Sequence, residues 1–387
     1  MSDNKPLISV IMPVKNNEKY FPKAAQSVMK QTFENWELVI VEGNSDDNTG
    51  KIADEYADSD DRVVVLHENE WIYESLNIGI SRAKGEYVTF LNSDDLLMPG
   101  ALSKASEFIE KYGVDLFLFA VSTTVCDENQ NVLSDDSKDI ISLMPNEFVL
   151  NNFDECKANW GTIMRIGLLN NQLNVYRKSL IKDLRFRNDI FGADYYFNLQ
   201  MLPKMNSIGY YPECLYRFNA YQGVKGMNAS VGKYYPYKHQ MYNDFYYKSI
   251  ELFATYGCLS PNILKLRRKI RIMEFAAEID TYQFESCRLS LEQKLWDIFR
   301  YTAELSDILN LEKEFANIEN KALAVCYALI SSSNENPGKM ANVCDGIRAI
   351  FDISKGKTPD VKRIFDMVQD YYNPAHIGIT ICNKLLG

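Results

Sequence analysis

The sequence predicts an α/β fold with a mostly parallel, doubly wound sheet, followed by an all-helical module. Over roughly the first third of the chain, short apolar runs alternate with segments of helical spacing. The runs are continuously apolar, as expected for strands that are buried on both faces. After about residue 233 the pattern changes to apolar residues spaced three and four apart, with lysine and arginine between them.

Strand and helix patterns follow one another in the order that a parallel sheet requires. The predicted strands lie at residues 7–14, 36–43, 62–68, 86–92, 114–122 and 208–218. Predicted helices lie at residues 21–31, 44–57, 73–83 and 192–202, and residues 168–181 read as a strand followed by a helix. Later helices are expected at residues 263–277, 289–332 and 340–372. We therefore expect one domain over residues 1–232 and a helical domain over residues 233–387.

The bulk composition limits the class of protein. A chain of 387 residues is too long for one small core, which agrees with two domains. Its net charge of -10, from 42 basic and 52 acidic residues, argues against a nucleic-acid partner. The eight cysteines include no CxxC pair, so neither a zinc site nor a disulfide framework is indicated. Without a secretory apolar region at the N-terminus, or an apolar run of about 20 residues, we expect a cytoplasmic protein with free thiols.

Polar residues gather where the predicted strands end. Ligands of such sheets bind beyond the carboxyl ends of the strands, where Pro13, Glu42, His67 and the pair Asp94-Asp95 fall. Two adjacent carboxylates repel each other, and a hard divalent cation with oxygen ligands would offset that repulsion. The alternative is that the aspartates cap the following helix. His67 is expected to be a structural histidine outside the chemistry.

Four segments, in this order along the chain, carry a more specific signal: "ISVIMPVKNN", "VIVEGNSDDNT", "IYESLNIGISRAKGEYVTFLNSDD" and "GADYYFNLQML". Together they resemble family 2 glycosyltransferases with the GT-A fold, of the non-processive kind that builds bacterial surface glycans. The resemblance implies inverting, metal-dependent transfer of a sugar from a nucleotide-sugar, a UDP-sugar by preference, to a hydroxyl of a glycan or lipid-linked saccharide. Because the Gln-x-x-Arg-Trp segment of processive relatives is absent, we expect only one or a few sugars per encounter.

The resemblance also implies roles for the residues after the fourth strand. Asp94 and Asp95 would hold Mn²⁺ or Mg²⁺ against the diphosphate of the donor, with Asp95 as the more direct ligand. Asn92, Ser93 and Asp94 would contact the nucleotide-sugar. Asn92 stands where the family often has aspartate, so one carboxylate of the motif is missing.

Further donor contacts follow from the same resemblance. Pro13 and Val14 would line the nucleotide through their backbone, and Asn77 would contact the nucleotide-sugar. Glu42 would accept a hydrogen bond from the uracil N3–H, at a position where the family usually has aspartate. Asp47 fits a family position too, but capping of the following helix explains it equally well.

Asp194 is the candidate catalytic residue. In the family an acidic residue that opens a late helix acts as general base on the acceptor hydroxyl. The alternative is a helix N-terminal aspartate favoured by the helix dipole. In the following segment, residues 216–230, Arg217 or Lys225 could contact phosphate, although a plain surface loop is favoured.

Two other functions stay open. One is a non-catalytic sugar-nucleotide-binding or scaffold protein, to which Glu42, Asn92 and Ala193 would point as departures from the family. The other is a sugar nucleotidyltransferase, against which the absence of a glycine cluster after the first strand counts. The helical domain would suit acceptor recognition, oligomerisation or membrane docking, and the apolar tail at residues 376–387 either a membrane contact or packing onto that domain.

Overall fold

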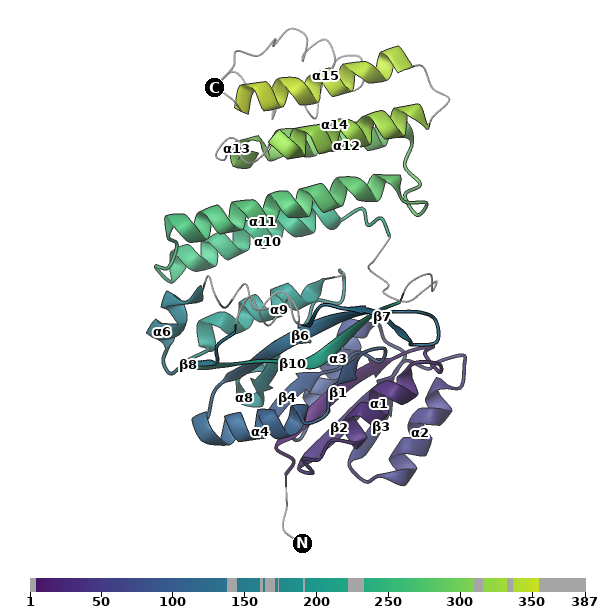
Figure 1. Cartoon of the computed structure of the whole chain (residues 1–387), viewed down its shortest axis with the longest axis vertical. Coiled ribbons are helices and arrows are strands. Elements are labelled where there is room, and N and C mark those ends of the chain that lie inside the picture. Colours follow the sequence, from purple (N-terminus) through teal and green to yellow (C-terminus); the bar gives the residue numbers. More distant parts are fainter. Residues whose placement is uncertain are drawn as a thin grey trace. The chain divides into compact units, whose positions relative to one another are not determined.

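The chain folds into two compact units, traced in Figure 1. The computed structural model describes residues 5–137, 145–160, 163, 171–172, 174–190, 192–221, 233–309, 316–332 and 337–354. One unit comprises Met1–Ala229 and Phe253–Cys258, and the other comprises Ser230–Leu252 and Leu259–Gly387.

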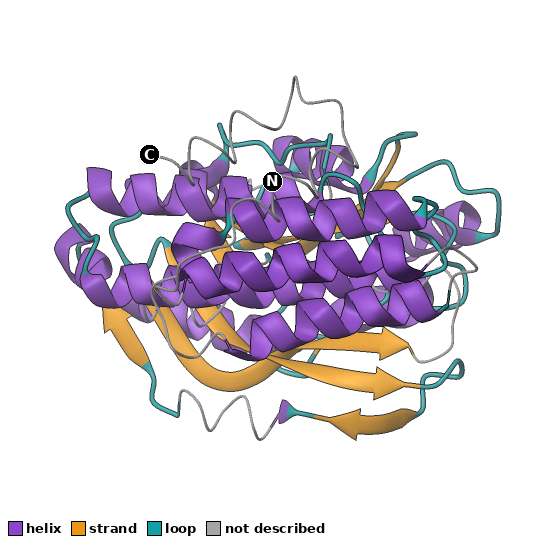
Figure 2. Ribbon diagram, turned by 90° about the horizontal axis from the view of Figure 1, so that it is seen from above, coloured by secondary structure: helices purple, strands orange, loops and turns teal. Residues whose placement is uncertain are grey.

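A mixed sheet of ten strands, counted over the described residues, forms the first unit (Figure 2). The strands are β1 (Ile8–Val14), β2 (Trp36–Glu42), β3 (Val63–His67), β4 (Tyr87–Phe90), β5 (Leu96–Leu97), β6 (Leu116–Cys126), β7 (Val132–Asp135), β8 (Phe148–Leu150), β9 (Asn174–Arg177) and β10 (Ile208–Tyr221). Their order is β3-β2-β1-β4-β9-β6-β10-β5, with β7 paired to β6 and β8 paired to β10.

The predicted α/β class is confirmed, and parallel pairing is concentrated in two blocks. Strands β3, β2, β1 and β4 form the first block, and β6 with β10 forms the second. Strand β9 lies antiparallel between the blocks, and the short strands β5, β7 and β8 are antiparallel to their neighbours. The sheet is therefore mixed, with β9 as the strand that joins the two parallel blocks.

Helices cover both faces of this sheet. They are α1 (Phe21–Met29), α2 (Thr49–Ser59), α3 (Ile72–Arg82), α4 (Ala101–Tyr112), α6 (Phe153–Ala158), α8 (Lys178–Ile181), α9 (Ala193–Met201) and the 3₁₀ turn η1 (Leu202–Lys204). Alternation along β1 directs Ile8, Val10 and Met12 into the core shared with α1, α2 and α4. Ile11 points to the opposite face, where a Cβ on Gly79 of α3 would overlap it. The glycine therefore allows α3 to lie close against β1.

The second unit confirms the predicted helical module. It contains α10 (Lys238–Thr255, whose last turn belongs to the first unit), α11 (Pro261–Asp280), η2 (Thr281–Gln283), α12 (Leu291–Glu304), α13 (Ser306–Leu309), α14 (Ala316–Ser331) and α15 (Pro337–Ser354). Ser290 begins α12 with a capping box to Gln293, which satisfies amides at the helix start. The helical segments predicted over residues 289–332 correspond to α12, α13 and α14. The expectations for residues 355–372 and 376–387 lie outside the described residues. None of the described helices combines the length and apolarity needed to cross a bilayer.

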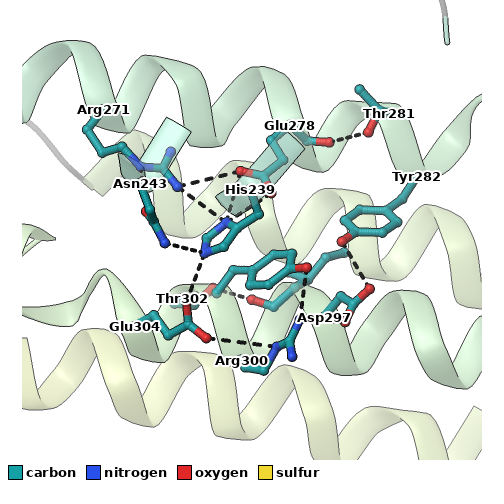
Figure 3. Close-up of polar contacts among 12 residues, drawn as sticks. His239, Asn243, Arg271, Glu278, Thr281, Tyr282, Asp297, Arg300, Thr302 and Glu304 are labelled. Atoms are coloured by element: carbon teal, nitrogen blue, oxygen red, sulfur yellow. Dashed lines mark hydrogen bonds and ion pairs between the residues drawn. The ribbon is translucent and has the colours of Figure 1, made fainter. Parts of the chain in front are cut away.

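A buried polar network lies among the helices of this unit (Figure 3). His239 Nδ1 lies 2.9 Å from Glu278 Oε1, and its Nε2 lies 2.9 Å from Glu304 Oε2. Arg271 Nη2 is 3.7 Å from Glu278 Oε2, and the Tyr301 ring stacks on the imidazole at 3.5 Å. The two carboxylates differ in environment, because the Glu278 side chain is 4% exposed and that of Glu304 is 41% exposed.

This difference predicts unequal effects of two matched substitutions. Glu278→Gln leaves Arg271 and His239 buried without their carboxylate, and should lower the free energy of unfolding by about 3–5 kcal/mol. Glu304→Gln removes a half-exposed partner of the same imidazole and should cost about 1 kcal/mol or less. Urea denaturation followed by circular dichroism measures both. Equal losses would contradict the assignment of Glu278 as the buried anchor of the network.

Candidate active site

The loop after β4 is held by the carboxyl group of Asp95. Asp95 Oδ1 accepts a hydrogen bond from the Asn219 amide at 2.8 Å, and Oδ2 accepts from the Tyr216 hydroxyl at 2.6 Å and from Asn92 Nδ2 at 3.0 Å. The residue is fully buried. Burial raises the pKa of Asp95 well above its usual value, and repulsion from Asp94 raises it further. Both oxygens of this carboxyl group therefore face protein donors.

Asp94 presents the opposite arrangement. Its backbone oxygen accepts hydrogen bonds from Asn219 Nδ2 at 2.7 Å and from the Tyr221 hydroxyl at 3.2 Å, which fixes the main chain. Among the described residues, only its own backbone N–H bonds to its carboxyl group, and burial raises the pKa of Asp94 to about 6. A desolvated carboxylate without a compensating donor is suited to a cation. The geometry therefore favours Asp94 over Asp95 as a ligand.

Ser93 connects this loop to the neighbouring strand ends. Asn17 Nδ2 donates to Ser93 Oγ at 2.9 Å and to its backbone oxygen at 3.1 Å. The amide of Asn17 donates to Thr49 Oγ1 at 2.8 Å. The loops that follow β1 and β4 and the start of α2 are thereby joined at the carboxyl edge of the sheet.

Glu42, at the end of β2, is saturated with donors. Its Oε1 accepts from the Ser45 amide at 2.8 Å and the Ser45 hydroxyl at 2.5 Å. Its Oε2 accepts from the Asn44 amide at 3.1 Å and contacts His67 Nδ1 at 3.0 Å. Burial acts to raise the pKa of Glu42, but the hydrogen bonds from Ser45 and His67 outweigh it and lower the pKa. Since a carboxylate offers about four lone-pair sites, a hydrogen bond from a base would have to displace one of these donors.

His67 is held between two carboxylates. In addition to Glu42, it contacts Asp54 through Nε2 at 2.9 Å. The hydrogen bonds that the imidazole makes to the carboxylates of Glu42, the larger effect, and Asp54 raise the pKa of His67 above 6.5. The imidazole thus serves to hold β3, β2 and α2 together at this edge, in keeping with its expected structural role.

Pro13 and Val14 lie in register with Val41 and Glu42. Both side chains are buried, so only the backbone of this strand end can reach a ligand. The Val14 oxygen already accepts from the Gly43 amide at 2.9 Å. The expected nucleotide contacts of these two residues stay a prediction.

Asp47 and Asn77 have internal partners. Asp47 Oδ1 accepts from the Thr49 amide at 2.9 Å, a contact of the helix-start type. Asn77 Nδ2 donates to the Phe186 oxygen at 3.0 Å, and its Oδ1 accepts from the Phe186 amide at 2.8 Å. The side-chain amide of Asn77 therefore holds a protein segment, and its expected contact with the donor sugar stays a prediction.

Asp194 is the second residue of α9 and is half-buried. Burial of its carboxyl group raises the pKa of Asp194 to about 7, and no donor to that group occurs in the part of the chain that is described. Helix α9 packs on β4 through Phe197 and Phe90, whose ring centroids lie 6.2 Å apart. The helix that carries Asp194 is therefore anchored to the strand that leads to Asp94.

Tyr216 and Asn219 are site residues that sequence reasoning did not identify. The strand was expected to end at residue 218, with a surface loop favoured over residues 216–230, but β10 continues to Tyr221. Arg217 Nε donates to Asn219 Oδ1 at 2.9 Å within that strand. The apolar periodicity of a sequence does not show which residues of distant strands contact each other. Tyr216 and Asn219 therefore could not be recognised as partners of Asp95. The expected phosphate contact of Lys225 lies outside the described residues.

Comparisons with known proteins agree with this architecture. Residues 9–167 match the model of Glycosyl transferase family 2. Glycosyltransferase GlyG of Streptococcus pneumoniae serotype 4 is 35% identical over 114 residues, which cover 29% of this chain and 38% of the relative. Putative teichuronic acid biosynthesis glycosyltransferase TuaG of Bacillus subtilis is 40% identical over 111 residues, covering 28% and 44% respectively. Residues 9–167 are therefore similar to glycosyl transferase family 2, and the matches span less than half the length of these relatives.

A solved structure extends the likeness to the second unit. The crystal structure of S. aureus TarS 1-349 in complex with UDP-GlcNAc has a TM-score of 0.51 and 20% sequence identity, covering 90% of this chain and 92% of that chain. At this identity the likeness concerns the fold. It supports the GT-A architecture followed by a helical region.

The position of His67 predicts a pH-dependent contribution to stability. The pKa of His67 is raised in the folded state, so protonation of the imidazole stabilises the fold. This stabilisation is complete below the unfolded-state pKa of about 6.5 and is lost as the pH rises through the folded-state pKa. His67→Gln should therefore lower the melting temperature more at about pH 5.5 than at about pH 9. Calorimetry of both proteins at the two pH values measures this difference. A difference that is constant, or that grows with pH, would show that the imidazolium does not stabilise the edge.

Proposed function

We propose that the protein is an inverting, metal-dependent glycosyltransferase that moves a sugar from a nucleotide-sugar to a hydroxyl of a glycan or lipid-linked saccharide. The observation that carries this proposal is the Asp194 carboxyl group, which is desolvated, free of donors from the described residues and has a pKa of about 7. A general base works best when its pKa lies near the operating pH. The match of residues 9–167 to the model of Glycosyl transferase family 2 supports the reaction class.

The donor side is assigned to the loop after β4. Asp94 fits a hard divalent cation, Mn²⁺ or Mg²⁺, because its oxygens are desolvated and, among the described residues, accept a hydrogen bond only from the backbone N–H of Asp94 itself. No group of three or more His, Cys, Asp or Glu side chains able to hold a metal occurs among the described residues, so oxygens of the donor diphosphate would complete the shell. When bound, such an ion neutralises charge on the departing diphosphate. Asp95 serves as the buried anchor that holds Asp94 in place.

The nucleotide is assigned to the carboxyl edge of β1 and β2, with a UDP-sugar as the preferred donor. Pro13 and Val14 would offer backbone atoms there, and Asn92 and Ser93 would face the donor beside Asp94. Glu42 would act mainly by shaping the turn through Asn44 and Ser45, because its oxygens are already occupied. Residues 1–232 would thus bind the donor and carry the chemistry.

The acceptor side is assigned to Asp194. Its carboxylate would take the proton of the acceptor hydroxyl while that oxygen attacks the anomeric carbon from the face opposite the diphosphate. Attack on that face inverts the configuration at the carbon. Its partial burial limits competing water around the carboxylate and keeps it basic near neutral pH. Residues 233–387 are proposed to recognise the acceptor, with homo-oligomerisation or peripheral docking at the inner face of the membrane as the other roles that this module would suit.

Substitution of the proposed base provides the first test. Asp194→Asn should lower kcat by about 10²–10⁴-fold, because the proton acceptor is lost while the shape is kept. In the wild type, kcat/KM should rise with pH through about 7 as the carboxyl group loses its proton. Asp183→Asn, an exposed aspartate, is the matched control and should retain activity. The measurement is UDP release from UDP-sugars with Mn²⁺ present.

The same assay separates catalysis from a sugar-nucleotide-binding scaffold. A scaffold would bind UDP equally well in the wild type and in Asp194→Asn, with neither protein turning over any sugar donor tested. That outcome would overturn the proposed transferase activity.

The two neighbouring aspartates should respond differently to amide substitution. Asp94→Asn removes a desolvated charge whose one donor among the described residues is its own backbone N–H, so the melting temperature should hold or rise while Mn²⁺-dependent UDP binding is lost. Asp95→Asn disturbs three hydrogen bonds and should lower stability by about 1–3 kcal/mol. Calorimetry and titration of Mn²⁺ with UDP test this pair. Retained metal dependence in Asp94→Asn would contradict the ligand assignment.

A further inference from the structure

We propose that Tyr73 and Asn77, one turn apart on α3, are positioning residues that fix the first turn of α9 and thereby the Asp194 carboxyl group. The inference deepens the proposed function and depends on it for its catalytic meaning. Its structural part concerns only contacts between α3 and the segment that leads into α9.

The first contact is made by Asn77. Its side-chain amide both donates to and accepts from the backbone of Phe186, at 3.0 and 2.8 Å. A second donor hydrogen of the same amide reaches Glu74 Oε2 at 3.1 Å. Because Asn77 is buried and bonds both backbone groups of one residue, it fixes the position and the orientation of Phe186 together.

The second contact joins Phe186 to α9. The Phe186 ring stacks on Phe197 with centroids 3.9 Å apart and an angle of 3° between the rings. Both rings also pack edge-on against Phe90 of β4. Phe197 lies one turn after Asp194, so the stack sets how α9 rests on the sheet.

The third contact is made by Tyr73 at the start of the helix. Its hydroxyl accepts a hydrogen bond from the Gly192 amide at 2.8 Å. Gly192 precedes α9 and has φ of 83°, a left-handed conformation that favours glycine. The Tyr73 ring, which is buried, also stacks on Phe186 with centroids 5.9 Å apart. Tyr73 therefore reaches both ends of the segment from Phe186 to Gly192.

Asp194 itself has no donor to its carboxyl group among the described residues, so its placement depends on the backbone that carries it. It lies two residues after Gly192, whose amide donates to Tyr73. Catalytic groups must be held to within a fraction of an ångström, and small displacements from remote substitutions reduce rates strongly. The contacts from α3 supply that constraint.

The test is Tyr73→Phe, which removes only the hydroxyl acceptor. We expect kcat to fall about 10- to 100-fold while KM for the nucleotide-sugar stays unchanged, because the donor side is untouched. The first turn of α9 should loosen, so that water reaches Asp194 and the acid limb of the pH profile moves below about 7. Asn77→Asp, which replaces an amide donor with a carboxylate facing the Phe186 oxygen, should act in the same direction.

Tyr87→Phe is the matched control. Tyr87 is also buried, and its hydroxyl donates to the Val114 backbone oxygen at 2.9 Å, at the opposite end of β4 from Asp94. Its loss should cost stability without changing kcat or the pH profile. If Tyr87→Phe and Tyr73→Phe alter kcat and the pH profile equally, Tyr73 is merely structural and the inference fails.

Hydrogen exchange of the peptide over residues 186–197 tests the structural part of the inference and does not depend on enzymatic activity. Exchange should rise in Tyr73→Phe and remain at the wild-type level in Tyr87→Phe. Unchanged exchange in Tyr73→Phe would overturn the inference. Faster exchange in a protein that transfers no sugar would leave the positioning contacts in place and overturn the proposed function instead.

Discussion

The hydrogen bonds to the buried Asp95 carboxyl group hold the candidate donor site together. Removing a carboxyl group from water is costly unless donors replace the water, and here Tyr216, Asn219 and Asn92 do so. Two of these donors come from β10, which is separated from β4 in the sheet by β9 and β6. The contact therefore joins both parallel blocks of the mixed sheet. It also fixes the main chain of Asp94, whose own carboxyl group accepts, among the described residues, only from its own backbone N–H.

The hydrogen bonds to each carboxyl group of this unit indicate whether it has a structural or a chemical role. Glu42 accepts from four donor atoms, which lower its pKa in spite of burial. Asp94 and Asp194 are desolvated without such donors, and burial raises the pKa of each. Perturbed carboxyl groups of this second kind are typical of functional sites, whereas saturated ones hold backbone turns. The same residue type thus performs two tasks according to its neighbours.

The core of the helical unit also contains buried charged residues that depend on hydrogen-bonding or oppositely charged partners. Residues that look solvent-facing by charge, Arg267, Arg271 and Glu278, lie buried along α11. Each charge is tolerable because an opposite charge or a polar group faces it: Ser249 accepts from Arg267, and His239 lies between Arg271 and the glutamates. Such a network is stable only as a complete set, since removing one member leaves another buried charge unpaired.

The sequence by itself determined the α/β class, the helical module and the strand ends where polar residues gather, because apolar periodicity and chain order are local properties. Asp94, Asp95 and Asp194 were named as site candidates from the resemblance of their segments to family 2 glycosyltransferases, and their roles stay predictions. Only the tertiary structure decided that Asp95 is an anchor, that Glu42 is saturated and that Asn77 holds Phe186. Those roles depend on donors 2 to 124 residues away in the chain, such as Asn219 on Asp95, and no local pattern encodes the distance between such atoms.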